Sequence, residues 1–192
     1  MTSTKDRLRR ELITARRTVT EAVHTAEATA LTRHILDLAA QGTVCAYVPV
    51  GSEPGSVAML DALHDTGARV LLPVAVTGAH GTPLPLCWGE YRPGELAAAR
   101  FGLLEPGGSR LPAATLAEAG LVLVPALAVD RRGVRLGRGA GFYDRSLPRR
   151  DPAARLMAVV RDDELLDEVP AEPHDVRMTD ALTPGRGVVA VG

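Results

Sequence analysis

Aromatic residues are scarce in this chain: they make up 3% of its 192 residues, as one tryptophan, three tyrosines and two phenylalanines. Hydrophobic residues nevertheless reach 46%, so the core must be built mainly from alanine, leucine and valine. A chain of this length can bury roughly 70% of its unfolded surface, so it needs neither disulfides nor metals to fold. We therefore predict a single domain spanning residues 1–192.

Cysteine is also rare, and the pattern of a zinc site or a redox pair is absent. Cys45 and Cys87 both lie in apolar stretches, and no CxxC or Cys/His spacing accompanies them. Because a free cysteine packs as a small buried hydrophobe, we expect both thiols to be reduced core residues.

Neither charge sign dominates, and no long apolar run occurs. The formal net charge is -1, whereas binders of nucleic acid or membrane surfaces usually carry a strong basic excess. No window reaches the roughly 18 apolar residues of a membrane span, and the charged N-terminus lacks the apolar segment of a signal peptide. These absences predict a soluble, cytoplasmic protein that binds neither nucleic acid nor membrane. We also expect it to be a monomer or weak dimer.

Apolar runs alternate with helical patterns along most of the chain. Helical spacing predicts two helices within residues 4–40, the second starting at a capping box over residues 18–21. A further helix is expected over 56–67, and a short strand over the PLCWG segment. Buried strands are expected over 43–50, 69–76, 121–129 and 154–160, an extended segment over 175–183, and an edge strand over 187–192. This alternation predicts an α/β fold, a mainly parallel β-sheet flanked by helices.

The stretch RLGRGAGFYDR, residues 135–145, places glycines at every second position between arginines. We expect this glycine loop to follow the strand 121–129 directly and to open a helix on its far side. Backbone N–H groups and a helix N-terminus would then converge on an anion, and arginines add charge-assisted contacts to phosphate oxygens. The loop therefore favours a phosphate site over a tight solvent-facing turn.

The spacing of the glycines limits which phosphate-containing ligands this loop is expected to bind. The Walker pattern GxxxxGK[ST] is absent, and the spacing GxGxG differs from the dinucleotide fingerprint GxGxxG, which disfavours an NAD-dependent dehydrogenase. Asp144 would repel phosphates unless a cation lies between them, and Mg²⁺ takes one or two carboxylates plus phosphate oxygens. A nucleoside triphosphate with Mg²⁺ fits best. The alternative is that Asp144 is a first-turn acid paired with Arg145 or Arg138.

The segment VPALAVDRRGVRLGRGAGFYDRSL, residues 124–147, resembles the signature of the 5-formyltetrahydrofolate cyclo-ligase family. Three further blocks resemble the family in the right order, namely KDRLR (5–9), AYVPVGSEPGSVAML (46–60) and RFGLLEP (100–106). The ending VPAEPHDVRMTDALTP (169–184) does so too. The resemblance implies a methenyltetrahydrofolate synthetase-like (NagB/RpiA/CoA transferase-like) fold. It also implies ATP- and Mg²⁺-dependent closure of 5-formyltetrahydrofolate to 5,10-methenyltetrahydrofolate, with release of ADP and phosphate.

The resemblance assigns the nucleotide site to the glycine loop and the first helix. Lys5 and Arg9 share one helical face, with Arg16 further along it; the alternative is a solvated basic face. Arg138 and Asp144 are the implied catalytic residues. The implied ATP-binding residues are Lys5, Arg9, Arg135, Leu136, Gly137, Arg138, Gly139, Ala140, Gly141, Phe142 and Tyr143.

The metal carboxylates implied by the resemblance are Asp144 and Asp175. Asp180 is the alternative to Asp175, and His174 is either a partner of Asp175 or a plain loop histidine.

For the folate, the resemblance implies Glu53, whose carboxylate would accept from the polar pterin edge. Its alternative is an exposed loop acid. Val48, Phe142 and Trp88 complete the implied substrate residues, although Trp88 is equally compatible with the core.

Three positions depart from the family pattern. Phe142 replaces a tyrosine and so loses a hydroxyl, Ala140 replaces glycine or lysine, and Val129 replaces a phenylalanine that could wall the site. These changes bear on substrate affinity more than on reaction type. They keep two alternatives open, a paralogue acting on another formylated substrate and a non-catalytic nucleotide- or folate-binding regulator.

Overall fold

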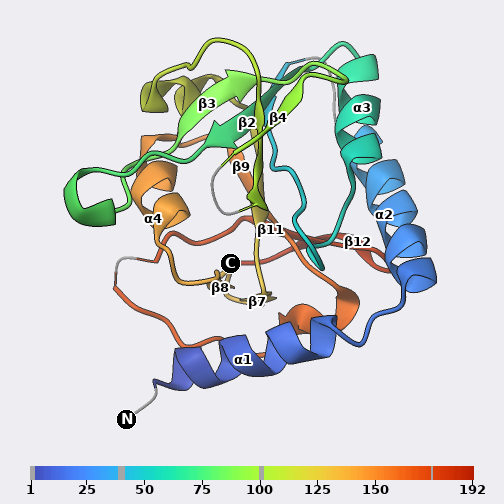
Figure 1. Cartoon of the computed structure of the whole chain (residues 1–192). Helices are drawn as coiled ribbons and strands as arrows, with labels where there is room; N and C mark the ends of the chain where they lie inside the picture. The colour runs from blue at the N-terminus through green and yellow to red at the C-terminus, as the bar shows by residue number, and fades with distance from the viewer. Residues whose placement is uncertain (1–2, 39–41, 100–101, 174) are drawn as a thin grey trace.

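The molecule is built around a seven-stranded sheet of order β12-β11-β9-β6-β1-β2-β3, shown in Figure 1. The computed structural model describes residues 3–38, 42–99, 102–173 and 175–192. The five inner strands run parallel, and the two outermost strands join antiparallel. The strands are β1 (Thr43–Cys45), β2 (Arg69–Val74), β3 (Cys87–Glu90), β6 (Leu121–Pro125), β9 (Arg155–Val159), β11 (Asp180–Thr183) and β12 (Gly187–Ala190). The predicted α/β fold with a mainly parallel sheet is confirmed.

Helices and short turns cover both faces of this sheet. On one side α2 (Glu21–Leu36) and α3 (Val57–Asp65) pack against alternate strand residues such as Val44 and Val70. On the other side Cys45 and Leu71 point toward α4 (Phe142–Ser146), η3 (Ala113–Glu118) and η4 (Leu147–Arg149). Because both faces are buried, the strands read as continuous apolar runs.

The helix starts differ slightly from prediction. The helix α1 (Thr4–Arg16) begins after Ser3, whose hydroxyl accepts from the Asp6 N–H. The N-cap of α2 is Thr20, which accepts from the Val23 N–H, so the capping box expected over residues 18–21 is wrong by two residues. An N-cap is fixed by which hydroxyl reaches a free N–H, and two threonines compete here.

The predicted strand 121–129 is two strands in different sheets, which is a correction. The main-sheet strand β6 ends at Pro125, and β7 (Ala128–Asp130) pairs instead with β8 (Arg135–Leu136) and β10 (Leu165–Leu166) in a small three-stranded sheet. The glycine loop therefore leaves the β7–β8 hairpin rather than the main sheet. The hairpin turn needs Gly133 at φ +78°, where a side chain would collide with the Met178 carbonyl.

Asp130 locks this hairpin. Its fully buried carboxylate accepts from the N–H groups of Arg132, Val134 and Val169. Burial alone would raise the pKa of Asp130, but the Val169 and Val134 donors, with Arg132, outweigh it and lower the pKa below 3.8. The hairpin that carries the glycine loop thus has a rigid polar anchor.

The remaining elements lie at the edges of the molecule. The helix α1 packs Leu8 and Leu12 on the small sheet, and the predicted short strand at PLCWG is β3. Cys45 and Cys87 are both free thiols. No helix in the described ranges is long and apolar enough to cross a membrane. The other short elements are η1 (Ala79–Gly81), β4 (Leu96–Ala98), β5 (Leu104–Pro106) and η5 (Asp162–Glu164).

Candidate active site

The glycine loop between β8 and α4 forms a common wall between two cavities. The first cavity has a volume of about 590 Å³ and the second about 550 Å³. Six residues line both of them: Arg135, Gly137, Gly139, Ala140, Gly141 and Asp144. A ligand in either cavity would therefore lie beside the same short stretch of backbone.

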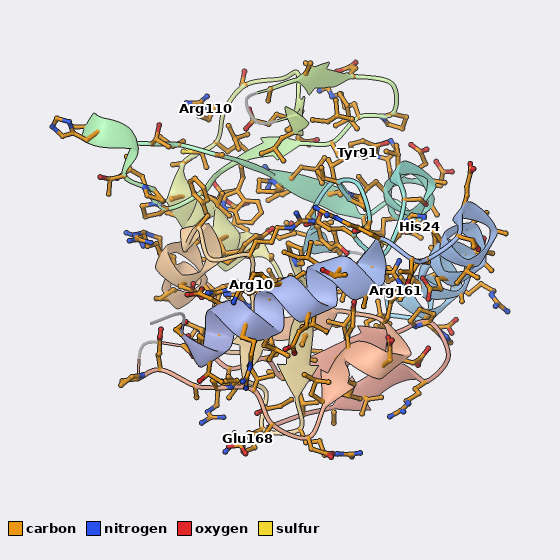
Figure 2. The ribbon with its side chains drawn as sticks, turned by 60° about the horizontal axis from the view of Figure 1, so that its bottom comes forward. Arg10, His24, Tyr91, Arg110, Arg161 and Glu168 are labelled. Carbon is orange, nitrogen blue, oxygen red and sulfur yellow. The ribbon has the colours of Figure 1, made fainter. Side chains whose placement is uncertain are left out.

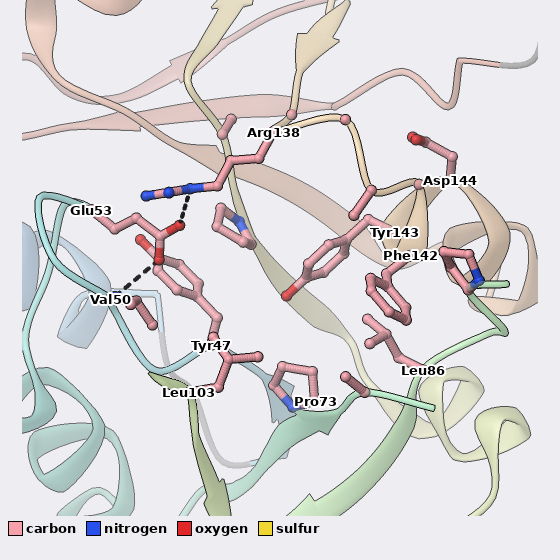
Figure 3. Close-up of a pocket in the computed structure, with 18 of the residues that line it drawn as sticks. Tyr47, Val50, Glu53, Pro73, Leu86, Leu103, Arg138, Phe142, Tyr143 and Asp144 are labelled. Atoms are coloured by element: carbon pink, nitrogen blue, oxygen red, sulfur yellow. Dashed lines mark hydrogen bonds and ion pairs between the residues drawn. The ribbon is translucent and has the colours of Figure 1, made fainter. Parts of the chain in front are cut away.

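The first cavity opens at the carboxyl ends of β1, β2 and β6, where ligands of open α/β sheets bind. Its walls are mainly apolar, with Glu53 at one side (Figure 3). The predicted residues Val48, Glu53 and Phe142 all line it. The prediction missed Tyr47, Val50, Pro73, Leu86 and Leu103, which carry no signal in the sequence that separates them from core residues.

Glu53 is held in place at the rim of the first cavity. Its carboxylate accepts from the Val50 N–H at 3.0 Å and from Arg138 Nε at 2.9 Å. The side chain is only 12% exposed, so the alternative of a solvated loop acid does not describe it. Arg138 lines the first cavity rather than the described part of the second, which places it on the Glu53 side of the loop.

Tyr143 lines the first cavity with its phenol side chain. Figure 3 shows its ring reaching from α4 toward Tyr47. The hydroxyl is buried and has no hydrogen-bond partner among the described residues. Burial, and next the Glu53 carboxylate, raise the pKa of Tyr143 well above 10, with Arg135 opposing. The phenol therefore stays neutral and keeps its proton as a donor.

The second cavity is strongly polar, with one more cation than acid in its wall. The cations are Lys5, Arg9, Arg135 and Arg145, and the acids are Asp144, Glu172 and Asp175. Lys5 Nζ lies 3.1 Å from Asp175 and 3.3 Å from Glu172. Arg9 Nε donates to the Gly137 carbonyl at 3.0 Å. The Lys5 side chain is 11% exposed, so this is no solvated basic face.

Arg16, on the same helix, does not reach the second cavity as described. Its buried guanidinium donates to both carboxylate oxygens of Glu164, at 2.6 and 2.8 Å, and to the Ala126 carbonyl at 2.6 Å. It lines the first cavity instead. The extension of the nucleotide-binding stripe to Arg16 is therefore wrong, because about three turns further along the same helix face Arg16 meets Glu164 and Ala126 instead of the glycine loop.

The geometry of the glycine loop indicates that an anion would be attracted mainly by side-chain cations and less by the helix N-terminus. Gly139 and Gly141 adopt φ values of +99° and +78°, which only glycine takes readily. The helix that follows, α4, has five residues, so its dipole is much weaker than that of a long helix. Side-chain cations supply most of the positive potential.

The two predicted metal carboxylates both line the second cavity. Asp144 pairs with Arg135, rather than with the expected Arg145 or Arg138, and Asp175 pairs with Lys5. Two carboxylates beside a basic, phosphate-sized cavity suit Mg²⁺ completed by phosphate oxygens. Within the described residues no group of three or more metal-ligating side chains exists.

The alternative metal ligand Asp180 is committed elsewhere. Asp180 lies on β11, and its carboxylate accepts two hydrogen bonds from Arg155, at 2.7 and 3.1 Å. It is not among the described lining residues of either cavity. His174 lies outside the described residues, so its expected role is not addressed.

Two residues expected near the substrate are in the core. Trp88 is 1% exposed on β3 and packs with Leu71 and Leu86. Val129 is fully buried on β7. Neither belongs to the described walls of the cavities. The core alternative for Trp88 is thus favoured, and the valine at 129 does not remove a wall of the site.

Known proteins share both the sequence and the fold. The chain is 63% identical over 188 residues to the 5-formyltetrahydrofolate cyclo-ligase of Mycolicibacterium smegmatis, covering 97% of each chain. It is 29% identical over 146 residues to the enzyme of that name from Escherichia coli, covering 75% of this chain and 79% of the other.

Solved structures of two 5,10-methenyltetrahydrofolate synthetases share the fold. That from Mycoplasma pneumoniae superposes with a TM-score of 0.71 at 15% identity, over 92% of this chain and 96% of the other. That from Aquifex aeolicus also gives 0.71, at 20% identity, over 98% and 93%. The sequence profile of the 5-formyltetrahydrofolate cyclo-ligase family matches residues 1–184. The chain therefore belongs to the 5-formyltetrahydrofolate cyclo-ligase family.

Proposed function

We propose that this protein catalyses the ATP- and Mg²⁺-dependent cyclisation of 5-formyltetrahydrofolate to 5,10-methenyltetrahydrofolate, releasing ADP and phosphate. The observation that carries the proposal is the shared wall of the two cavities. A folate in the apolar first cavity and a triphosphate in the polar second cavity would both lie against the glycine loop, so that their reacting ends can come into direct contact beside it. This arrangement suits transfer of a phosphoryl group from one ligand to the other.

The chemistry explains why the two ligands must meet. The formyl oxygen attacks the terminal phosphorus and ADP leaves. The neighbouring folate nitrogen then attacks the formyl carbon and loses its proton, and the C–O bond breaks to release phosphate. An unmodified formyl oxygen would have to leave as hydroxide, which is a far poorer leaving group than phosphate. Positioning and charge neutralisation carry such a reaction.

On the folate side, Glu53 supplies acceptor oxygens for the polar pterin edge, and Arg138 holds that carboxylate in place. Tyr143 offers the one buried phenol donor that lacks a partner among the described residues. Phe142 and Val48 provide apolar contact.

On the nucleotide side, Lys5, Arg9 and Arg135 neutralise phosphate charge in the second cavity. Asp144 and Asp175 would hold Mg²⁺, which supplies charge neutralisation at the phosphates when bound. Both carboxylates are now paired with protein cations. We infer that arrival of Mg-ATP exchanges these partners, so that Arg135 and Lys5 turn to phosphate oxygens.

The test is an absorbance assay for the methenyl product from 5-formyltetrahydrofolate with Mg-ATP. We expect product in the wild type, and a much higher KM for the folate in Glu53→Gln with little change for ATP. No product despite normal ATP binding would instead favour a paralogue with another formylated substrate or a non-catalytic regulator.

A further inference from the structure

The backbone of the loop that carries Glu53 is held at three successive carbonyl groups. The carbonyl oxygens of residues 52, 53 and 54 each accept a hydrogen bond from a side chain elsewhere in the chain. The donors, in that order, are Arg161 Nη1 at 3.1 Å, His24 Nε2 at 3.0 Å and Tyr47 Oη at 2.7 Å. Because a carbonyl can only accept, His24 carries a proton on Nε2.

These donors are themselves fixed. Arg161 is buried and donates from Nε to Glu27 at 2.8 Å, and its own N–H donates to Glu164 at 2.8 Å. Glu27 lies one turn from His24 on α2, so one helix face supports two of the three contacts. Figure 2 shows His24 and Arg161 near each other beside one end of α1.

Apart from these three contacts and the Arg138–Glu53 ion pair, the hydrogen bonds of the loop among the described residues are internal. Gly51 and Gly55 flank it at φ values of +60° and +102°, so it is a turn outside the strand ladders. Its internal bonds are the Glu53 N–H to the Val50 carbonyl at 3.2 Å and the Val50 N–H to the Glu53 carboxylate. External donors must therefore set where the Glu53 carboxylate points.

We propose that His24 and Arg161 are positioning residues that, with Tyr47, orient Glu53 toward the folate. The proposal rests on the substrate role proposed for Glu53. Neither His24 nor Arg161 belongs to the walls of the two cavities, as far as the described residues form them. His24 therefore reaches the substrate through its contact with the loop, whereas Arg161 also contacts Glu164, the partner of Arg16 in the wall of the first cavity.

His24→Ala is the sharpest variant, because alanine suits a helix and the ring lies outside both cavities as described. His34→Ala is the matched control: it lies on the same helix, and its Nε2 contacts the Pro184 carbonyl at 3.1 Å, far along the chain from the loop. His24→Gln keeps an N–H donor of similar reach. Arg161 is left intact because its removal would break a buried charge network.

We expect His24→Ala to raise the KM for 5-formyltetrahydrofolate about three- to tenfold, the effect of one hydrogen bond. The KM for ATP should stay within about twofold. His24→Gln should restore most of the loss, and His34→Ala should resemble the wild type. An unchanged folate KM in His24→Ala, or an equal rise in His34→Ala, would overturn the proposal.

Amide hydrogen exchange separates this proposal from the proposed reaction, because it needs no substrate. Residues 50–55 should exchange faster in His24→Ala than in His34→Ala. If the wild type makes no methenyl product, the reaction is wrong, and exchange alone decides the positioning role: faster exchange supports it and equal exchange overturns it.

Discussion

We expect the Tyr143 hydroxyl to lower the stability of the ligand-free protein and to strengthen substrate binding by donating a hydrogen bond to the folate. Its oxygen is buried and has no partner in the part of the chain that the structure describes. Its ring packs against the core on the sheet face that α4 covers. Tyr143→Phe keeps the ring and removes only the oxygen. We therefore expect opposite effects on stability and on affinity.

The magnitudes follow from the cost of an unpaired buried donor. Such a group costs about 1–3 kcal/mol, so Tyr143→Phe should stabilise the ligand-free protein by up to that amount. For a domain of this size each kcal/mol moves Tm by roughly 2–4 °C, which gives a rise of up to about 12 °C. The lost hydrogen bond to the folate should raise its KM about three- to tenfold.

Thermal unfolding without ligand and steady-state kinetics with Mg-ATP measure the two effects. Tyr47→Phe is the control with the opposite sign, because its hydroxyl donates to the Pro54 carbonyl at 2.7 Å, and its loss should lower Tm. A fall in Tm for Tyr143→Phe similar to that control would show that the hydroxyl has a partner in the free protein. The reasoning would then be refuted.

Three further changes test the charges of the site and its support. Asp144→Asn should lower kcat at least ~100-fold in the methenyl absorbance assay through loss of the metal carboxylate, whereas exposed Asp167→Asn should not. Arg16→Met should destabilise the protein by up to about 3–5 kcal/mol in urea, because the buried Glu164 loses its two-point guanidinium partner and keeps only its contacts with Arg161; adding Glu164→Gln should recover much of this, and two additive losses would contradict the pairing. Asp130, where backbone donors outweigh burial to lower the pKa, contributes stability that is complete above its unfolded pKa near 3.8 and is lost as pH falls through the lower folded value. Asp130→Asn should flatten this acid loss in urea titrations between about pH 6 and 2, and an unchanged slope would count against it.

The parallel sheet could be predicted because its strands are buried on both faces. Continuous apolar runs such as 69–76 and 154–160 then stand out from the amphipathic helices between them. The same signal misled at 121–129, because β6 and β7 are both buried although they belong to different sheets. Hydropathy records burial, not the sheet in which a residue is buried.

Within the site, contiguous residues were easier to predict than distant pairs. The glycine loop spans residues 135–145, so its chemistry is visible in one motif. Glu53 and Arg138 are 85 residues apart, and only the tertiary fold makes them an ion pair. The hydrogen bonds that hold the Glu53 loop leave still less trace, since their acceptors are backbone carbonyls that every residue type provides.

The structure also makes the replacement of the family's tyrosine by Phe142 less important for substrate binding than the sequence suggested. A tyrosine there would offer the first cavity a further hydroxyl, and its loss was expected to weaken the substrate contact. Phe142 lines that cavity and packs on the core, so the apolar wall remains. The donor that lacks a partner in the described structure sits one residue later, on Tyr143. Any affinity lost at Phe142 is therefore limited to about one hydrogen bond. Phe142 is not among the described lining residues of the second cavity, where we propose that phosphate binds, so we expect the reaction type to be unchanged.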